Sequence, residues 1–300
     1  MMLRFMILAG LAVTAAADCT RAFLKNATDA YVAAQTAGQA TSISALAASN
    51  VTYTENNKPV DIKAGTLSRP IKIDFTRSTH DTVRCATFTE IIAATDPHPY
   101  VIHTRMVFTG GDSGKASLIE SVVTDAGDWL FNATGTLDLN AGEDWAPIPA
   151  GKRESRAAIQ AVGDAYFDRF TGNTSVVVPW GPPCYRLEGG LPARGTLQGD
   201  DCVQAWPSGI YVPYRRYVVD EELGAVDIFV GFPGLDRTQG DAPMPDSHFF
   251  RVEGGKIRYL HTASACIEAG CGLNGTFGKL KRSQRVEKRS RSRPLYAVGA

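Results

Sequence analysis

The chain contains an internal repeat, and this feature limits its possible folds more than any other. Four short matches occur in the same order, at offsets of 130 to 141 residues: Asp29-Ala30-Tyr31 with Asp164-Ala165-Tyr166, Tyr53-Thr54-Glu55 with Tyr185-x-x-Glu188, Gly65-Thr66-Leu67 with Gly195-Thr196-Leu197, and Gly114-Lys115 with Gly255-Lys256. A single match of this length occurs by chance, but four in one order predict a duplication with insertions in the loops.

Both halves have the same predicted order of elements. Each begins with an apolar-periodic helix, continues with a short loop that carries a glutamate, and then has strand-like runs bounded by Gly, Pro and Asp. The predicted strands are Ile71–Phe75, Val83–Ala93, Tyr100–Phe108, Ser117–Thr124, Tyr214–Val219, Ala225–Phe232, His248–Val252 and Lys256–Ala263. This order predicts an α+β fold with one antiparallel sheet in each half. We expect domains at 18–139 and 151–272, joined by a linker at 140–150.

The two ends of the chain carry signals of their own. Residues 1–17 have the parts of a secretory signal peptide: Arg4, the apolar run Phe5–Val13 and a small-residue cleavage site. Residues 273–300 are predicted to be a disordered tail, and Lys279–Arg293 concentrates positive charge there. The tail is an extension without a folded role, a protease-processed segment, or a binder of anionic surfaces. The formal net charge of the whole chain is +0, which gives no indication of nucleic-acid binding, and no run after the signal is long and apolar enough to span a membrane.

Cysteines and sequons agree with export from the cell. Six cysteines form an even set, which in an oxidising compartment predicts three disulfides and no metal site. Proximity favours Cys184–Cys202 and Cys266–Cys271, which leaves Cys19–Cys85. Five N-x-Ser/Thr sequons predict glycosylation at Asn26, Asn50, Asn132, Asn173 and Asn274. The expected location of the protein is extracellular.

Several longer pieces carry a resemblance to a known family. The pieces are Tyr53-Thr54-Glu55-Asn56-Asn57, Gly127-Asp128-Trp129-Leu130-Phe131-Asn132-Ala133, Cys184-Tyr185-Arg186-Leu187-Glu188-Gly189-Gly190, Asp246-Ser247-His248 and Arg251-Val252-Glu253. Between residues 18 and 272 the chain resembles secreted fungal proteins of unknown function with tandem NTF2-like, or SnoaL-type, domains. The resemblance implies two cone-shaped domains, each a curved antiparallel sheet packed by a helix. It implies no single activity, because proteins of this fold include isomerases, cyclases, dehydratases and binding modules.

Candidate site residues concentrate in the second half. Glu188, His248 and His261 are the candidate catalytic groups, because a carboxylate and a histidine in an apolar cone can act as base and acid. Alternation along the strands places His261 on a face with Tyr259, and His248 on a face with Phe250. The candidate ligand-binding residues are Arg186, Tyr185, Tyr166, Tyr259, Tyr31, Tyr53, Glu55 and His103, with Glu90 beside them in the first half.

Each of these groups also has a purely structural interpretation. Arg186 and Glu188 can form an ion pair, and a histidine on an apolar strand face is often a core residue. The sequence contains no GxGxxG, P-loop, HExxH or GxSxG motif, so no cofactor is predicted. Two functions fit these residues: a protein that binds a small apolar molecule or a partner, or a cofactor-independent isomerase, cyclase or dehydratase. The long loop of Trp180–Pro213 favours the second half as the active one.

Overall fold

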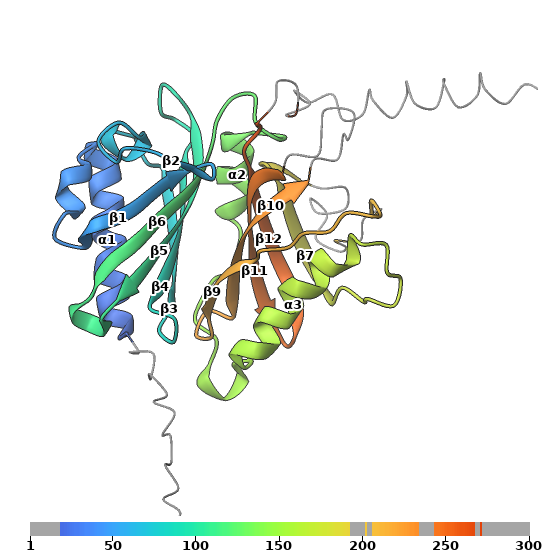
Figure 1. The fold of residues 1–300 in the computed structure, drawn as a ribbon. Helices are drawn as coiled ribbons and strands as arrows, with labels where there is room; N and C mark the ends of the chain where they lie inside the picture. Colours follow the sequence, from blue (N-terminus) through green and yellow to red (C-terminus); the bar gives the residue numbers. More distant parts are fainter. Residues whose placement is uncertain (1–18, 193–201, 203–205, 234–242, 268–270, 272–300) are drawn as a thin grey trace, which may run out of the picture.

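The computed structural model describes residues 19–192, 202, 206–233, 243–267 and 271. The predicted signal peptide, the basic tail, Asn274 and the repeat at Gly195-Thr196-Leu197 lie outside the described residues. Within them the protein is a mixed α+β structure with two curved sheets and few helices, so the predicted α+β class is confirmed (Figure 1).

The two sheets have six strands each and the same strand order. The first has the order β2-β1-β6-β5-β4-β3 and the second the order β8-β7-β12-β11-β10-β9. The elements, in chain order, are α1 (Arg21–Ala37), β1 (Ala47–Glu55), β2 (Lys58–Pro59), β3 (Phe75–Asp81), β4 (Ala86–Ala93), β5 (Tyr100–Thr109), β6 (Lys115–Thr124), α2 (Ala133–Asn140), α3 (Arg156–Arg169), β7 (Trp180–Glu188), β8 (Leu191–Pro192), β9 (Arg216–Asp220), β10 (Ala225–Pro233), β11 (Pro243–Glu253) and β12 (Lys256–Ser264). The four short 3₁₀ turns are η1 (Ala40–Ile43), η2 (Thr66–Ser68), η3 (Gly111–Ser113) and η4 (Ala150–Lys152).

The two long helices begin at side-chain caps. The Thr20 hydroxyl accepts a hydrogen bond from Phe23 N at the start of α1, and the Ser155 hydroxyl accepts one from Ala158 N at the start of α3. Each helix buries one apolar stripe, which in α1 includes Leu24, Ala27 and Tyr31. Among the described helices, none is long and apolar enough to cross a membrane.

The sheets differ from the predicted ones at one edge. β1 pairs with β6, and β7 with β12, in parallel, so the sheets are not wholly antiparallel. Both glutamates that were expected in loops, Glu55 and Glu188, are the last residues of strands β1 and β7. No hairpin joins β1 to β6, because four other strands lie between them in sequence, and a parallel pair is then possible.

Other predicted strand bounds were also wrong at their N-terminal ends. The first strand of the β3–β4 hairpin is Phe75–Asp81 rather than Ile71–Phe75, and the second begins at Ala86 rather than Val83. A tight turn at residues 82–85 separates them, with Cys85 at a positive φ of 48°. The continuous apolar and β-branched run hid this turn from the sequence pattern.

The outer face of each sheet packs on its own long helix, and the inner faces pack on each other. α1 contacts β3 and β4, whereas α3 contacts β9, β10 and β11 (Figure 1). A third apolar cluster lies between the sheets, where the rings of Phe88 and Phe249 have centroids 4.5 Å apart. We call this sheet-to-sheet contact the seam.

The predicted linker is packed against the seam rather than free. Glu143 and Trp145 contact side chains of both sheets, and Ile148 N donates to Glu222 O at 2.8 Å. Trp145 stacks on Phe249, with ring centroids 4.6 Å apart. The connection between the halves is therefore part of the folded structure, and the domain boundaries stay a prediction.

Two reciprocal ion pairs join the halves. Arg156, the first residue of α3, donates from both terminal nitrogens to the carboxylate of Asp81, at 2.6 Å each. Arg21, the first residue of α1, forms the matching pair with Asp220. The two aspartates end the equivalent strands β3 and β9. Each also accepts a backbone hydrogen bond from the opposite half, from His80 N to Asp220 at 2.9 Å and from Val219 N to Asp81 at 3.0 Å. The halves thus meet around an approximate two-fold axis.

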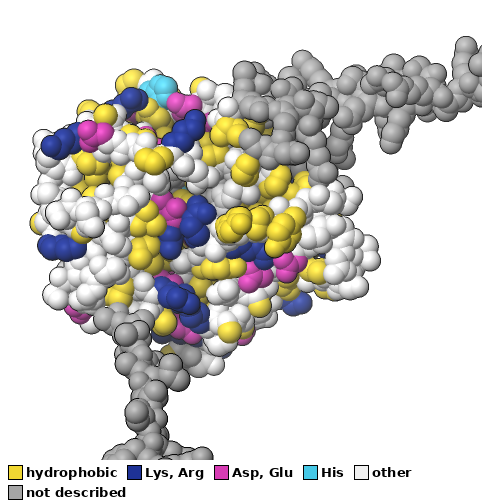
Figure 2. All heavy atoms as spheres, viewed as in Figure 1, with side chains coloured by type: hydrophobic (Ala, Val, Ile, Leu, Met, Phe, Trp, Pro, Cys, Tyr) yellow, Lys and Arg dark blue, Asp and Glu magenta, His cyan; other side chains and the backbone are white. Residues whose placement is uncertain are grey.

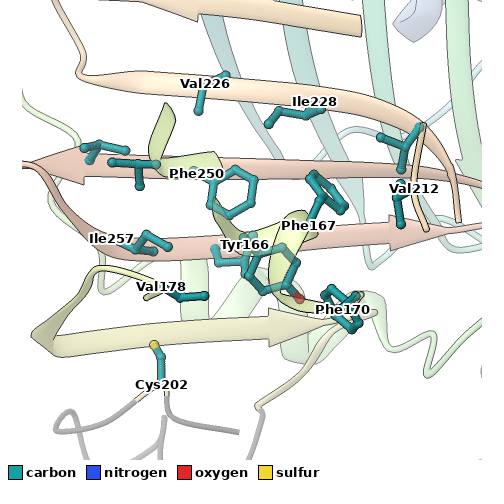
Figure 3. Packing of buried hydrophobic residues seen from close by; sticks show 14 of the residues in the cluster. Tyr166, Phe167, Phe170, Val178, Cys202, Val212, Val226, Ile228, Phe250 and Ile257 are labelled. Carbon is teal, nitrogen blue, oxygen red and sulfur yellow. The ribbon is translucent and has the colours of Figure 1, made fainter. Parts of the chain in front are cut away.

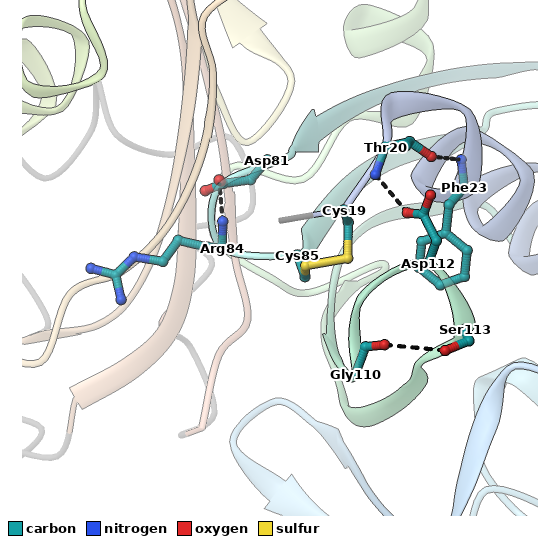
Figure 4. Close-up of a disulfide and its surroundings, with 9 residues drawn as sticks. All are labelled: Cys19, Thr20, Phe23, Asp81, Arg84, Cys85, Gly110, Asp112 and Ser113. Carbon is teal, nitrogen blue, oxygen red and sulfur yellow. Dashed lines mark hydrogen bonds between the residues drawn. A yellow bond between two sulfur atoms is a disulfide. The ribbon is translucent and has the colours of Figure 1, made fainter. Parts of the chain in front are cut away.

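All three predicted disulfides are confirmed. The bonds join Cys19 to Cys85, Cys184 to Cys202 and Cys266 to Cys271. The first anchors the segment before α1 to the β3–β4 turn, beside Asp81 and Arg84 (Figure 4). Three disulfides fit a protein that folds in an oxidising compartment.

Candidate functional site

Equivalent positions of the two sheets can be compared directly, because the strand registers match. On the face that packs against α1, neighbouring strands of the first sheet place Glu55, Ser121 and Thr104 in one row. On the face that packs against α3, the second sheet places Glu188, Thr262 and His248 at the same three positions. The two rows allow the polar groups at equivalent positions of the two halves to be compared.

In the first half the polar groups satisfy one another. Tyr31 Oη lies 2.7 Å from Thr104 Oγ1, which lies 2.8 Å from Ser121 Oγ. Burial raises the pKa of Tyr31 to about 12, so its hydroxyl stays neutral. The closed network gives these groups a structural role.

Glu55 anchors the neighbouring chain in the same way. Its carboxylate accepts a hydrogen bond from Tyr53 Oη at 2.5 Å, and it accepts two from the backbone and hydroxyl of Thr66. Tyr53 is the counterpart of Arg186, so the sequence match of Tyr53 with Tyr185 was wrong by one position. Burial and the charge of Glu55 raise the pKa of the Tyr53 hydroxyl well above its usual range. These candidate ligand-binding residues are therefore engaged with one another.

In the second half, His248 lies in an aromatic surround with an unsatisfied nitrogen. Its ring centroid lies 4.9 Å from that of Phe167 and 5.2 Å from that of Tyr166. Figure 3 shows Tyr166, Phe167 and Phe250 gathered in this core, where α3 covers the sheet. His248 is 4% exposed, and its Nδ1 makes no hydrogen bond to the described residues.

A carboxylate, that of Asp246, lies close to His248. One carboxylate oxygen of Asp246 lies 3.4 Å from His248 Nδ1, and the same oxygen accepts a hydrogen bond from Ser264 Oγ at 2.9 Å. Asp246 was not among the predicted site residues. The signal that could have found it is the spacing Asp246-x-His248, which places both side chains on one face of a strand.

Glu188 and Arg186 form an ion pair at the edge of the same face. Arg186 Nη1 lies 3.1 Å from Glu188 Oε2, and the two side chains are 8% and 29% exposed. The following glycines were expected to let the backbone approach a ligand. A Cβ at Gly189 would instead lie 2.0 Å from Trp129 O, and one at Gly190 would lie 2.2 Å from Asn132 O. The glycine pair therefore allows close contact with the segment before α2.

The predicted catalytic trio is divided between two faces of the sheet. Glu188 and His248 share the α3 face, with Thr262 between them, whereas His261 lies on the seam face opposite Phe249. Tyr259 and Tyr185 also lie on the seam face, and their ring centroids are 5.9 Å apart. His261 therefore cannot act together with His248 on one ligand.

His261 instead bridges two buried carboxylates. Its Nδ1 lies 3.0 Å from Glu90 Oε1 and its Nε2 lies 2.8 Å from Glu143 Oε1. Burial alone would lower the pKa of His261, but the charges of Glu143 and Glu90 outweigh burial and raise this pKa to about 9. Burial would also raise the pKa of Glu90, yet His261 and His103 hold it well below its usual range. The group is an imidazolium between two carboxylates.

This cluster continues across the seam. His103 Nδ1 lies 2.8 Å from Ser247 Oγ, which donates to Asp227 Oδ1 at 2.6 Å, and His103 Nε2 lies 3.5 Å from Glu90. The order Ser247–His103–Glu90 is that of a hydrolase triad. Ser247 is 0% exposed and is held by Asp227, so no substrate can reach its hydroxyl. The seam cluster connects the halves and has no opening for a substrate.

A half-open apolar pocket of about 210 Å³ lies in the first half, away from the seam. It opens between η1 and β1, and Lys63 is among its lining residues.

Within the described ranges, no group of three or more His, Cys, Asp or Glu side chains is placed to hold a metal ion.

Comparison with known proteins gives little functional information. No curated protein matches the chain. A solved protein of unknown function with a cystatin-like fold, from Methylobium petroleophilum PM1, is 16% identical over 49% of this chain and 98% of its own. Its TM-score is 0.28, which is too low for the two folds to be equated. Residues 152–264 match the model of a family described as a domain of unknown function, DUF8021.

Proposed function

We propose that the protein is a secreted glycoprotein of two tandem NTF2-like units, and that its second unit binds a small, mainly apolar molecule on the α3 face. The observation that carries this proposal is His248, a buried imidazole among aromatic rings whose Nδ1 has no hydrogen-bond partner among the described residues. A buried polar atom without a partner costs about 1–3 kcal/mol, and a ligand hydroxyl would remove that penalty.

The first half serves as an internal comparison. Thr104 occupies the position of His248 and is satisfied by Tyr31 and Ser121. The second half differs because His248, a larger side chain, occupies this position and its Nδ1 makes no hydrogen bond to the described residues. This difference supports the second half as the one that binds.

A pair of tryptophans marks the side from which a ligand would enter. Trp180 and Trp206 are only partly buried at the rim of the aromatic core, and their rings are stacked with centroids 6.2 Å apart. Pockets for small molecules are lined mainly by apolar and aromatic side chains with few polar groups. His248 would be the polar group that orients the bound molecule.

A catalytic function is the second candidate, and Asp246 favours it. A carboxylate 3.4 Å from His248 Nδ1 can orient the imidazole and stabilise its protonated form. With Glu188 on the same face, the residues would suit a cofactor-independent isomerase, cyclase or dehydratase. Glu188, His248 and Arg186 keep their proposed roles under this alternative, whereas His261 does not.

The test uses two probes that differ by one hydroxyl, 2-naphthol and naphthalene. We expect 2-naphthol to bind the purified protein more tightly than naphthalene, measured by fluorescence titration. His248→Phe should weaken 2-naphthol about tenfold, the equivalent of one hydrogen bond of about 1.4 kcal/mol, and leave naphthalene unchanged.

A matched control lies in the first half. Thr104→Val should lower stability without changing the binding of either probe. Equal binding of 2-naphthol to the wild-type protein and His248→Phe would refute the proposal, as would the absence of binding by both probes. Turnover of a candidate substrate that is lost in both His248→Phe and Asp246→Asn would establish the enzyme alternative.

A further inference from the structure

Two tyrosines in the second half are exposed to an unusual degree. Tyr214 is 87% exposed and Tyr211 is 69% exposed, and both belong to the extended segment that leads from Trp206 into β9. Their neighbours Ile210 and Val212 are 3% and 1% exposed and belong to the aromatic core. The buried side chains of Ile210 and Val212 thus fix the backbone of this segment, while the rings of Tyr211 and Tyr214 project into solvent.

The same segment is held by two arginines. Arg215 donates to Asp164 at 2.8 Å and to Asp168 at 2.6 Å, both on α3, and to the carbonyl of Val212 at 3.1 Å. Arg216 donates to both oxygens of Glu120 across the seam, at 3.1 and 3.2 Å, and also to the carbonyl of Tyr214. The C-terminal end of the tyrosine segment is therefore held in place.

Tyr214 also has a backbone conformation that tyrosine seldom adopts. Its φ is +57°, in the left-handed region that glycine and asparagine occupy more easily. Strained residues are kept mainly where they serve a function. Here the ring is exposed rather than packed in the core, so this conformation presents it on the surface.

We infer that Tyr211 and Tyr214 form a binding surface for a neutral polysaccharide. A tyrosine ring is a flat apolar body with a polar hydroxyl, and it can stack on the C–H face of a sugar while its hydroxyl bonds to the sugar. A rigid aromatic side chain loses little conformational entropy on binding.

Charge argues for an uncharged ligand. Both arginines of the segment are engaged with carboxylates, Arg215 with two aspartates and Arg216 with Glu120. The uncharged amide of Asn57 lies at the same place, where its oxygen accepts from Arg216 at 3.4 Å. A charged polymer would have to break these pairs, whereas a neutral one would not.

The size of the apolar surface argues against a protein partner. On the face drawn in Figure 2, hydrophobic side chains are interspersed with charged ones. Among the described residues, only five large hydrophobic side chains are exposed, and Val83 and Ile267 belong to other turns. A stable protein interface buries about 800 Å² on each partner around an apolar core, which two tyrosines do not supply.

The test is retention of the whole protein on insoluble polymers. Microcrystalline cellulose, chitin and insoluble β-1,3-glucan are incubated with the protein in low salt and in about 1 M NaCl, where exposed charges are screened within a few ångströms. We expect retention on at least one polymer, unchanged by salt, because no ion pair with the ligand is involved. Tyr211→Ala combined with Tyr214→Ala should lower retention at least tenfold and leave the melting temperature unchanged.

Three controls separate stacking from other causes. Tyr214→Phe should keep most of the retention, because its ring remains, and Val177→Ala, at another residue that is 79% exposed, should have no effect. His248→Phe should also bind normally, so the result is independent of the proposed ligand site. No retention on any of the three polymers would overturn the inference, as would retention that survives the double substitution or disappears in high salt.

Discussion

His261 connects three parts of the chain, and its replacement should show how much the seam contributes to stability. The imidazolium lies between Glu90 on β4 and Glu143 in the connecting segment, and it is itself on β12. Other groups facing the cluster are Arg77, 3.3 Å from Glu90 and 3.7 Å from Glu143, and the ring of Trp145. His261→Gln keeps a hydrogen-bonding side chain of moderate size but removes the positive charge.

The size of the effect follows from the pKa of His261. The difference between the ordinary value of 6.5 and a value of about 9 in the folded protein corresponds to about 3 kcal/mol. The removal of one partner from a buried ion pair costs about the same, 3–5 kcal/mol, because a carboxylate is left uncompensated. We therefore expect His261→Gln to lower the free energy of unfolding by about 3 kcal/mol at pH 6.

The pH dependence has a definite sign. The pKa of His261 is higher in the folded chain than in the unfolded one, so its contribution is complete below pH 6.5 and is lost as the pH rises through about 9. Between pH 6.5 and about 9 the free energy of unfolding of the wild-type protein should fall. Over the same range the free energy of unfolding of His261→Gln should fall by about 3 kcal/mol less.

The assay is guanidinium unfolding followed by tryptophan fluorescence, with the disulfides intact, at pH 6, 7.5 and 9. His98→Gln is the matched control, because His98 contacts Asp125 at 2.8 Å but both side chains are largely exposed, at 58% and 43%. This control should change stability by less than about 1 kcal/mol. The reasoning is refuted if His261→Gln stays within about 1 kcal/mol of wild type at pH 6, or if the two pH profiles are parallel.

Three further outcomes can be measured on the same material. Asp220→Ala should cost about 3 kcal/mol in chemical unfolding, because Arg21 and a buried backbone N–H lose their acceptor, whereas Asp29→Ala in the exposed pair with Lys25 should cost less than about 1 kcal/mol. Removal of Cys19–Cys85, which closes a loop of 66 residues, should cost about 4 kcal/mol, and removal of Cys266–Cys271, with a separation of 5, about 2 kcal/mol. Mass spectrometry of glycopeptides should find the exposed sequons at Asn26, Asn50 and Asn173 occupied and Asn132 largely unmodified, since Asn132 is half-buried and its side chain caps α2.

Local sequence signals predicted the parts of the fold that depend on local physics. The periodicity around Tyr31 and Tyr166 predicted both long helices, and the spacing of the cysteines predicted the disulfide pairs. Strand β1 was missed because its burial does not alternate and because four other strands separate it from its partner β6 in the chain. A parallel pair of this kind leaves no hairpin signal in the sequence.

The arrangement of the candidate site residues was hard to predict from the sequence for a similar reason. Alternation paired His261 with Tyr259 and His248 with Phe250, because parity along a strand is a local property, but it did not show that the two histidines lie on opposite faces of the sheet. The face of the sheet that packs against the other half depends on long-range contacts. These contacts place His261 in the seam rather than under α3. The same limit hid Glu143, whose role depends on the path of the connecting segment over the seam.

The approximate two-fold axis explains why the halves differ most where they meet. His103 and Ser247 occupy equivalent positions and contact each other, as two copies of one residue would at the axis of a symmetric dimer. Away from the axis the equivalent contacts have different chemistry. Phe88 packs on Phe249 on one side. At the equivalent place on the other side, burial raises the pKa of Asp227 well above its usual range, and the charge of Arg105 partly opposes this rise.

Such divergence is possible because the halves belong to one chain. In a homodimer every substitution at the interface occurs twice, so a new charge must be balanced at two places at once. Within a single chain each side can change alone, provided that a partner for the charge arises elsewhere, as Glu90 on the opposite sheet and Glu143 in the connecting segment do for His261. The same freedom applies to the helix-covered faces. There the first half has the closed network of Tyr31, Thr104 and Ser121, while the second has at the equivalent position His248, whose Nδ1 makes no hydrogen bond to the described residues. The helix-covered face of the second half therefore contains the buried polar atom on which the proposed binding site depends.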